Sequence, residues 1–311
     1  MRSVKEFLLS KGLPEWVATR VSEAVDSLEE LAKTPPEVIS ERCGLDKDLA
    51  VEIARLAAEE AIEFTPAIEL AKQPRRQLKF GVRSLDNLLS GGLSEGSLVM
   101  IYGEPGVGKT QTALQLSVNV QLPEQEGGLG AGAVYLDTEG GFSGARVLAM
   151  ARAKGMDPKL ALSRVMVAQV RTVEALQVAI EKSEGLVRSG EVRLVVVDSL
   201  LAPFRAEYRG LNRLPARQQK MAKILAGLSR LADFGAVCVI TNHVVGKMSP
   251  LEQYGPAGGF TLGHAPDPIL RIRKSIGNRR IMSVEDSSSL PPGEALFAIL
   301  PEGLADVEEF E

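Results

Sequence analysis

The sequence predicts an α/β fold, with a mostly parallel β-sheet that ends in antiparallel strands and a small helical domain before it. The first reason is that, from Gly81 onward, apolar strand-like runs alternate with helical segments, an order that builds a parallel sheet with helices on both faces. The second is that the helical signal stops beyond residue 265, where short strands joined by turns follow. The third is the helical periodicity of residues 1–60, which Gly and Pro interrupt.

Length and composition fit this organisation. A chain of 311 residues can bury one sizeable core and a smaller module. The 45% of hydrophobic and 24% of charged residues describe an ordinary globular protein. No apolar run reaches the roughly 18 residues of a membrane span, so we expect no membrane partner. The first residues lack the apolar stretch of a secretory signal, and Cys43 and Cys238 do not suggest a disulfide framework, so we expect a cytoplasmic protein.

The first 80 residues divide into two parts. Residues 1–60 are predicted to form a bundle of short helices without a catalytic constellation. In residues 61–80, proline and charge replace periodic apolar residues, which predicts a linker. Phe64 and Ala67 lie in this linker, where apolar side chains gain free energy only when another surface buries them. Either a partner molecule or the protein's own domain could supply that surface.

Residues 81–311 are predicted to form the core that contains the sheet. Buried strands are expected at residues 97–102, 133–137, 165–170, 194–198 and 236–241. Helices are expected at residues 112–118, 146–153, 172–187 and 215–233. Short antiparallel strands are expected at residues 269–275, 280–285 and 295–300. Residues 245–263, rich in Gly and containing Pro, are expected to form a long loop, and loops of this length are usually functional or disordered.

A phosphate-binding motif lies between the first of these strands and the first of these helices. The pattern G-x-x-x-x-G-K-[ST] is matched in full by Gly103, Glu104, Pro105, Gly106, Val107, Gly108, Lys109 and Thr110. In this motif backbone N–H groups face phosphate oxygens, the lysine reaches the terminal phosphates and the Thr hydroxyl ligates Mg²⁺. The following helix directs its positive end at the anion. The sequence therefore predicts that the protein binds a nucleoside triphosphate with Mg²⁺.

Polar residues follow the carboxyl ends of three other strands, which is where ligands collect in parallel sheets. Asp198 has the position of a carboxylate that holds the Mg²⁺ shell together with Thr110, or else it caps a helix. Glu139 would stand one strand away, where it could orient or deprotonate the water that attacks the γ-phosphate; the alternative is a solvated carboxylate. His243 could sense the γ-phosphate and relay its presence to the following loop, or be a buried structural histidine.

The charge distribution limits how the protein could bind nucleic acid. The net charge is −4, and residues 1–60, with 13 acidic and 8 basic side chains, account for −5, which leaves +1 for the rest. Any contact with nucleic acid must therefore come from local basic clusters, although such clusters are usually solvated faces. One candidate cluster contains Arg205, Arg209, Arg213 and Arg217. The other contains Arg271, Arg273, Lys274, Arg279 and Arg280.

Taken together, these motifs resemble one family. The chain resembles the archaeal RadA recombinases and their eukaryotic counterparts, of the RecA-like superfamily, over nearly all of residues 1–311. The resemblance rests on residues 103–111, Tyr-Leu-Asp-Thr-Glu at 135–139, Val-Asp-Ser-Leu at 197–200, Phe-Arg-Ala-Glu-Tyr at 204–208, Ala-Arg-Gln-Gln-Lys at 216–220 and Pro-Pro-Gly-Glu-Ala at 291–295.

The resemblance implies a RecA-like P-loop ATPase core at residues 81–311 and a helix-hairpin-helix-like domain at residues 1–60. It implies a DNA-stimulated ATPase that uses ATP and Mg²⁺, forms filaments on single-stranded DNA and pairs it with homologous duplex DNA in repair, at the nucleoid. The implied catalytic residues are Glu139, Lys109 and His243. Gln111, Arg146 and Asp286 join the phosphate loop as nucleotide-binding residues, with Arg146 stacked on adenine and Asp286 capping ATP across a subunit interface.

The resemblance also implies contacts with DNA and with further subunits. Residues 205–217 correspond to the first DNA-binding loop of the family and residues 245–263 to the second. The implied DNA-binding residues are Arg205, Arg209, Arg213, Arg217 and Lys247. Phe64 and Ala67 fit the F-x-x-A motif by which one subunit docks on the ATPase domain of the next, in a filament or ring.

The sequence departs from the family pattern at several positions. After Glu139 the family usually has Asn-Thr-Phe-Arg-Pro-Glu-Arg, of which residues 140–146 keep only the Phe and the last Arg. His243 stands where the family normally has Gln, and the second loop contains a single cation, Lys247. These departures motivate an alternative hypothesis beside the recombinase, namely an ATP-binding RadA paralogue that regulates a separate recombinase without exchanging strands itself. A RecA-like ATPase unrelated to DNA is a third hypothesis, which the arginines of residues 205–217 disfavour.

Overall fold

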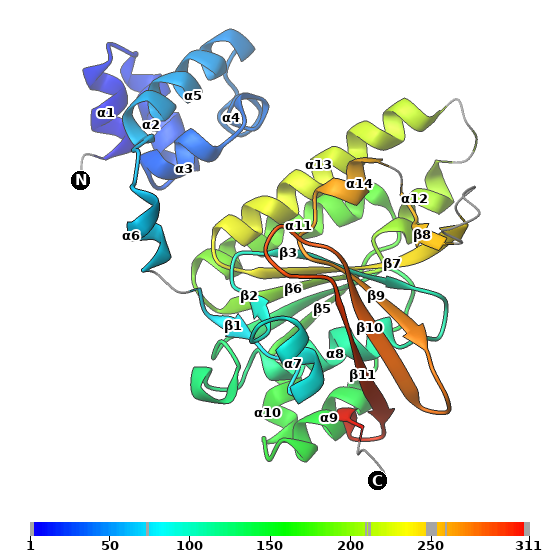
Figure 1. Ribbon diagram of the computed structural model, residues 1–311. Coiled ribbons are helices and arrows are strands. Elements are labelled where there is room, and N and C mark those ends of the chain that lie inside the picture. The colour runs from blue at the N-terminus through cyan, green and yellow to red at the C-terminus, as the bar shows by residue number, and fades with distance from the viewer. Residues whose placement is uncertain are drawn as a thin grey trace. The chain divides into compact units, whose positions relative to one another are not determined.

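The computed structural model of the chain describes residues 3–72, 75–208, 210, 213–246, 254–258 and 260–307 (Figure 1). The chain divides into two compact units, residues 1–74 and residues 75–311. The first unit is helical where it is described, and the second contains the β-sheets.

The N-terminal unit packs short helices around a core of its own, which includes Phe7, Leu31 and Ile53. Its helices are α1 (Val4–Ser10), α2 (Glu15–Ala24), α3 (Leu28–Lys33), α4 (Pro36–Cys43), α5 (Lys47–Ala61) and α6 (Ala67–Ala71). Local signals set several of these bounds. Ser3 forms a capping box at the start of α1, and Gly44 ends α4 in the left-handed conformation, with φ of 57°.

The segment predicted as a linker contains the short helix α6. Upstream of it, Phe64 is 99% exposed, and Ile62 and Ile68 on either side are 64% and 65% exposed. Three large apolar side chains therefore face water between positions 62 and 68. Exposed apolar groups at this density mark a candidate interaction surface.

The second unit is built on a mixed sheet with the strand order β12-β11-β10-β9-β3-β7-β6-β4-β5. Its strands are β3 (Leu98–Gly103), β4 (Gly132–Asp137), β5 (Val165–Gln169), β6 (Val192–Asp198), β7 (Val237–Gly246), β9 (Ile269–Lys274), β10 (Arg279–Asp286), β11 (Gly293–Leu300) and β12 (Gly303–Asp306). Strands β9, β3, β7, β6, β4 and β5 pair in parallel, whereas β10, β11 and β12 extend the sheet in antiparallel pairs. The predicted parallel sheet with an antiparallel end is therefore confirmed. A separate two-stranded sheet pairs β1 (Gln77–Leu78) with β2 (Leu93–Ser94).

The second unit also contains helices, several of which connect the parallel strands, as crossovers between such strands require. They are α7 (Arg83–Leu88), α8 (Lys109–Asn119), α9 (Gly144–Ala153), α10 (Pro158–Ser163), α11 (Val173–Arg188), α12 (Leu201–Glu207), α13 (Leu214–Asp233) and α14 (Phe260–His264), with a 3₁₀ turn at Glu124–Glu126. Helices α8, α9 and α10 cover one face of the sheet, and α11 and α13 cover the other (Figure 1). In the described ranges, no helix has both the length and the apolar character that crossing a membrane requires.

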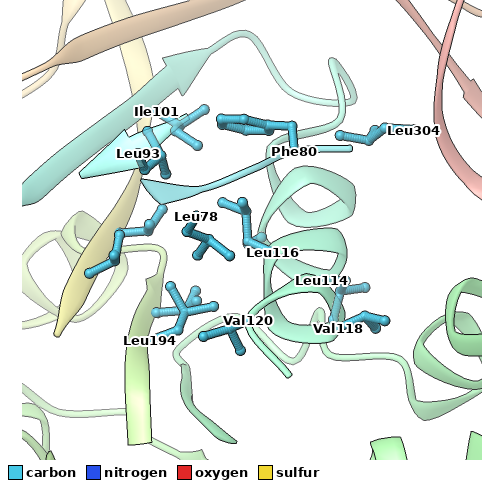
Figure 2. Close-up of a cluster of buried hydrophobic side chains, with 14 of the residues drawn as sticks. Leu78, Phe80, Leu93, Ile101, Leu114, Leu116, Val118, Val120, Leu194 and Leu304 are labelled. Atoms are coloured by element: carbon cyan, nitrogen blue, oxygen red, sulfur yellow. The ribbon is translucent and has the colours of Figure 1, made fainter. Parts of the chain in front are cut away.

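The central strands supply two hydrophobic cores because successive side chains of a strand point to opposite faces. On β3, Val99 and Ile101 belong to the core beneath α8, whereas Leu98, Met100 and Tyr102 belong to the core beneath α11 and α13. Figure 2 shows the first of these cores, with leucine and valine side chains of α8 gathered near strand residues. Burial on both faces fixes the register of β3, and so the point where its carboxyl end delivers the phosphate loop.

Residues 245–263 do not form one continuous loop. Strand β7 continues to Gly246 and pairs antiparallel with β8 (Tyr254–Pro256), and α14 follows. Residues 247–253 and 259 lie outside the described residues. The Gly and Pro content of the segment led us to expect one long loop. The structure instead pairs β7 with β8, and no pattern in the sequence predicts this pairing.

Candidate active site

The carboxyl ends of the parallel strands meet at a cavity of about 380 Å³. The sheet register brings these ends together, because Gly103 pairs with His243 and Asp137 pairs with Asp198. The cavity is lined by Pro105, Gly106, Gly108, Lys109, Thr110, Gln111, Glu139, Asp198, Ser199, His243, Arg280 and Ile299. Most residues that the sequence assigned to nucleotide binding and catalysis therefore line one cavity.

The phosphate loop connects β3 to α8 with its backbone exposed to the cavity. Gly106 and Gly108 have φ of 73° and 107°, a conformation that favours glycine. A Cβ on Gly108 would also meet Cδ1 of Ile299 at 2.2 Å, so a side chain there would displace the end of Ile299. Val107 is fully buried and anchors the loop in the core. Exposed loop backbone at the N-terminus of a helix is the arrangement that binds phosphate groups, so the loop fits a nucleotide.

Lys109 lies across the phosphate loop and is only 7% exposed. Its Nζ donates to the carbonyl oxygens of Gly103 and Glu104, each at 2.9 Å. Burial lowers the pKa of Lys109, while the carboxylates of Asp198 and Glu139 oppose this shift. The ammonium group is therefore held in a poorly solvated place where a neighbouring anion stabilises its charge.

Asp198 ends β6 and is nearly buried, at 5% exposure. Its Oδ2 accepts hydrogen bonds from the hydroxyls of Thr110 and Tyr135, both at 2.7 Å, and its Oδ1 accepts one from Thr241. Burial, reinforced by Asp198, raises the pKa of Tyr135, which keeps the phenol protonated as a donor. The Thr110 hydroxyl and the Asp198 carboxylate are thus adjacent hard oxygen groups, which suit Mg²⁺.

Other side chains do not provide a ready metal site. Among the residues that the structure describes, no three or more His, Cys, Asp or Glu side chains are grouped so that they could hold a metal ion. A divalent ion at Thr110 and Asp198 would therefore complete its shell with water and phosphate oxygens, as Mg²⁺ does with nucleotides.

Glu139 faces the same cavity from the segment after β4. Its Oε1 accepts a hydrogen bond from Ser199 Oγ at 2.9 Å and lies 3.1 Å from His243 Nε2. Burial raises the pKa of Glu139, but the hydrogen bonds from His243 and Ser199, with the nearby positive charges, outweigh it and leave the pKa below its ordinary value. Glu139 is therefore held as a carboxylate, oriented by two donors, and its side chain is 45% exposed.

Asp137 holds the segment that carries Glu139. The backbone N–H groups of residues 139–142, which we call the 139–142 strap, all donate to the Asp137 carboxylate at 2.7 to 3.2 Å. At the end of the strap, the ring of Phe142 packs edge-on against Tyr135, with 5.2 Å between ring centroids. The sequence analysis missed this function of Asp137. Its position at a strand end, before two glycines with accessible N–H groups, was the available signal.

Three further nucleotide-binding candidates lie at different distances from the cavity. Gln111 lines it, whereas Arg146 does not. Arg146 donates to Gln111 Oε1 at 2.7 Å and to the backbone carbonyls of Leu300, which ends β11, and of Pro301, which follows it. Asp286 pairs with Ile269 at the other end of β10 from the phosphate loop, so it does not approach the cavity of its own chain.

The candidate DNA-binding arginines are spread over α12, α13 and the segment between them. Arg205 in α12 is exposed, and its charge contributes to lowering the pKa of Lys109, so it lies within electrostatic reach of the cavity. Arg213 is exposed and Arg217 is half-buried in α13. Arg209 and Lys247 lie outside the described residues.

Arg280 was grouped with a basic cluster for nucleic acid, but the structure places it at the cavity. Its Nε donates to the carbonyl oxygen of Val107 in the phosphate loop at 3.0 Å. Arg273, on the adjacent strand, points to the opposite face of the sheet and forms an ion pair with Glu294 at 2.5 Å. Alternate residues of a strand point to opposite faces, so a cluster that looks uniform in sequence is divided between two surfaces.

Comparison with known proteins gives consistent matches. A family model described as Rad51 matches residues 73–307. The DNA repair and recombination protein RadA of Metallosphaera sedula is 36% identical, over 99% of this chain and 97% of that protein. The DNA repair and recombination protein RadA of Aeropyrum pernix is 39% identical, over 99% of this chain and 98% of that protein.

Proposed function

This chain belongs to the Rad51 family, and from that premise we propose that it is an ATP-dependent recombinase that acts in DNA repair by homologous recombination. The observation that supports the proposal most strongly is the convergence of Lys109, Asp198 and Glu139 on one cavity at the phosphate loop. A cation for the phosphates, an oxygen pair for Mg²⁺ and an oriented carboxylate are the groups that ATP hydrolysis requires.

Each group has a defined part in the proposed hydrolysis. The loop at residues 103–111 binds the phosphates, and Lys109 places its charge where negative charge develops in the transition state. Thr110 and Asp198 would hold Mg²⁺, which neutralises phosphate charge. Glu139 accepts the proton of the attacking water, and its hydrogen bonds to Ser199 and His243 fix its direction. Arg146 and Asp286 are proposed to contact the adenine and the nucleotide of a neighbouring subunit.

We assign DNA binding and assembly to other parts of the chain. Arg205, Arg209, Arg213, Arg217 and Lys247 are proposed to contact single-stranded DNA, with duplex DNA as the second partner. The exposed Phe64, together with Ala67, is proposed to dock on the next subunit of a filament or ring. This reading divides the chain into a helical domain at residues 1–60, a linker at 61–80 and an ATPase core at 81–311. The protein would act in the cytoplasm, at the nucleoid.

The experiment that tests the recombinase function is a D-loop assay. The protein, ATP and Mg²⁺ are mixed with a single-stranded oligonucleotide and a homologous supercoiled duplex, over a range of salt concentrations because phosphate contacts weaken with salt. We expect joint molecules that require ATP and homology. Their absence at every salt concentration, with active RadA as a positive control, would contradict strand exchange.

The alternative of a regulatory paralogue is not favoured. The relatives that match over nearly the full length are named as recombination proteins. The substituted segment after Glu139 also forms an ordered structure, because the N–H groups of the 139–142 strap bind Asp137. His243, in place of the usual Gln, lies 3.1 Å from Glu139 and so contacts the candidate catalytic carboxylate.

A further inference from the structure

Two cations on adjacent antiparallel strands lie beside the phosphate loop. Lys274 ends β9 and Arg280 lies near the start of β10, and the two residues are direct partners in the sheet register. We call them the β9–β10 cation pair. Nζ of Lys274 lies 3.6 Å from where a Cβ on Gly106 would stand. Arg280 donates to the Val107 carbonyl and lines the cavity.

The pair marks a change in the character of one sheet face. The residues two positions away on the same face, Ile272 and Met282, are also direct partners and are buried in the core beneath α8. Ile272 in turn pairs with Gly103, the first residue of the phosphate motif. The face that is apolar up to Gly103 therefore becomes cationic where the strands pass the loop. Lys274 is exposed and Arg280 is half-buried, so both side chains are open to a ligand at the loop.

Like charges directly opposite each other in a sheet are destabilising. In the part of the chain that the structure describes, neither member of the pair forms an ion pair with a carboxylate, whereas Arg273, on the opposite face, pairs with Glu294. Lys109 and the N-terminus of α8 add positive charge to the same region. A ligand with several negative charges would remove this repulsion.

We propose that the β9–β10 cation pair binds the phosphate chain of the nucleotide, as a second cationic contact in addition to Lys109. This inference rests on the proposed ATP site. Phosphates of DNA offer the same chemistry, but Arg280 contacts the phosphate loop itself and lines its cavity, so the nucleotide is the ligand that fits. The pair then contributes affinity that grows with the number of phosphates.

The test is titration calorimetry of the full chain with ATP, ADP and AMP in the presence of Mg²⁺. In Lys274→Ala/Arg280→Ala we expect the ATP affinity to fall by at least about tenfold, equivalent to about 1.4 kcal/mol. The ADP affinity falls less and the AMP affinity does not change. The matched control is Arg273→Ala/Arg279→Ala, which removes the same charge from the other face and is expected to bind ATP like the wild type.

A second variant separates charge from structural support. Arg280→Lys keeps the charge but loses the guanidinium that donates to Val107, so a phosphate contact predicts that it retains most of the ATP affinity. If Arg280→Lys loses as much affinity as Arg280→Ala, Arg280 supports the loop and the inference is wrong.

Two other results would also overturn the inference. The first is ATP affinity of the double variant equal to that of the control. The second is unchanged ATP affinity with weakened binding of a single-stranded oligonucleotide, which would assign the pair to DNA. If the wild-type protein binds no ATP, the proposed function fails together with the inference. This result is distinguishable from the others, because in those the wild type still binds ATP.

Discussion

Asp137→Asn tests whether one buried carboxylate positions the catalytic segment. In the wild type, four backbone N–H groups of the 139–142 strap donate to the two oxygens of Asp137. An amide in place of the carboxylate removes the charge and directs an NH₂ group at the single donor of Oδ2 or at the three donors of Oδ1, depending on how it rotates, so at least one hydrogen bond is lost. Loss of one hydrogen bond to a charged acceptor costs about 1.5 to 3 kcal/mol.

The strap carries Glu139, so this cost is expected to appear in the chemical step. A loss of about 1.4 kcal/mol in the transition state lowers the rate tenfold, and a displacement of about 1 Å can cost a hundredfold. We therefore expect kcat for ATP hydrolysis to fall about 10- to 100-fold. The ATP affinity should stay within about twofold, because Lys109 and the phosphate loop do not contact Asp137.

The assay combines steady-state ATP hydrolysis, calorimetric ATP binding and thermal melting. Asp157→Asn is the matched control, since Asp157 also accepts backbone N–H groups, at the start of α10 and away from the cavity. The control should lose some stability and keep its kcat. An unchanged kcat in Asp137→Asn, or a loss of kcat and ATP affinity together in proportion to lost stability, would refute the positioning function.

Three further predictions concern single residues. His243 helps to keep the pKa of Glu139 below its ordinary value, so Glu139 remains a carboxylate until the pH falls through this lowered pKa. Hydrolysis should be lost only below that pH, where Glu139 becomes protonated. His243→Ala should therefore raise the pKa of Glu139 and move the acid limb of the pH–rate profile to higher pH. His243→Gln, which keeps a donor, should move it less, and identical acid limbs in all three proteins would contradict the pairing. Phe64→Ala should convert oligomers to monomers in size-exclusion chromatography, because aromatic anchors at interfaces typically contribute about 2 kcal/mol or more. Trp16→Ala, which removes an exposed aromatic side chain of α2 outside this segment, is its control, and an unchanged elution volume for Phe64→Ala would exclude this anchor. Lys109→Ala should abolish hydrolysis measured by phosphate release, and wild-type turnover in this variant would remove the assignment of the site.

Sequence reasoning located the groups whose positions depend on local pattern. The phosphate motif determines its own loop, and Asp198 and Glu139 were located because acidic residues follow apolar runs there. These residues meet because parallel strands place their carboxyl ends at one edge. The apolar run and its final Asp were enough to predict the neighbour of Thr110, although 88 residues separate the two.

Contacts that depend on register across the sheet could not be predicted in this way. The sequence shows Arg273, Lys274, Arg279 and Arg280 as one basic cluster, and only the register of β9 against β10 places Lys274 directly opposite Arg280. The side chain of Arg146 bonds to the turn after β11, about 150 residues away, which no motif specifies. The sequence analysis treated Asp137 only as part of a motif. A carboxylate that accepts hydrogen bonds from nearby backbone N–H groups produces no periodic pattern in the sequence by which it could be recognised.

The most direct test of the proposed recombinase is ATP turnover with and without single-stranded DNA, with electron microscopy of the same mixtures. We predict turnover that DNA stimulates, and filaments that form on DNA in the presence of ATP and Mg²⁺. Turnover that does not respond to DNA, in samples that contain no filaments, would contradict the account.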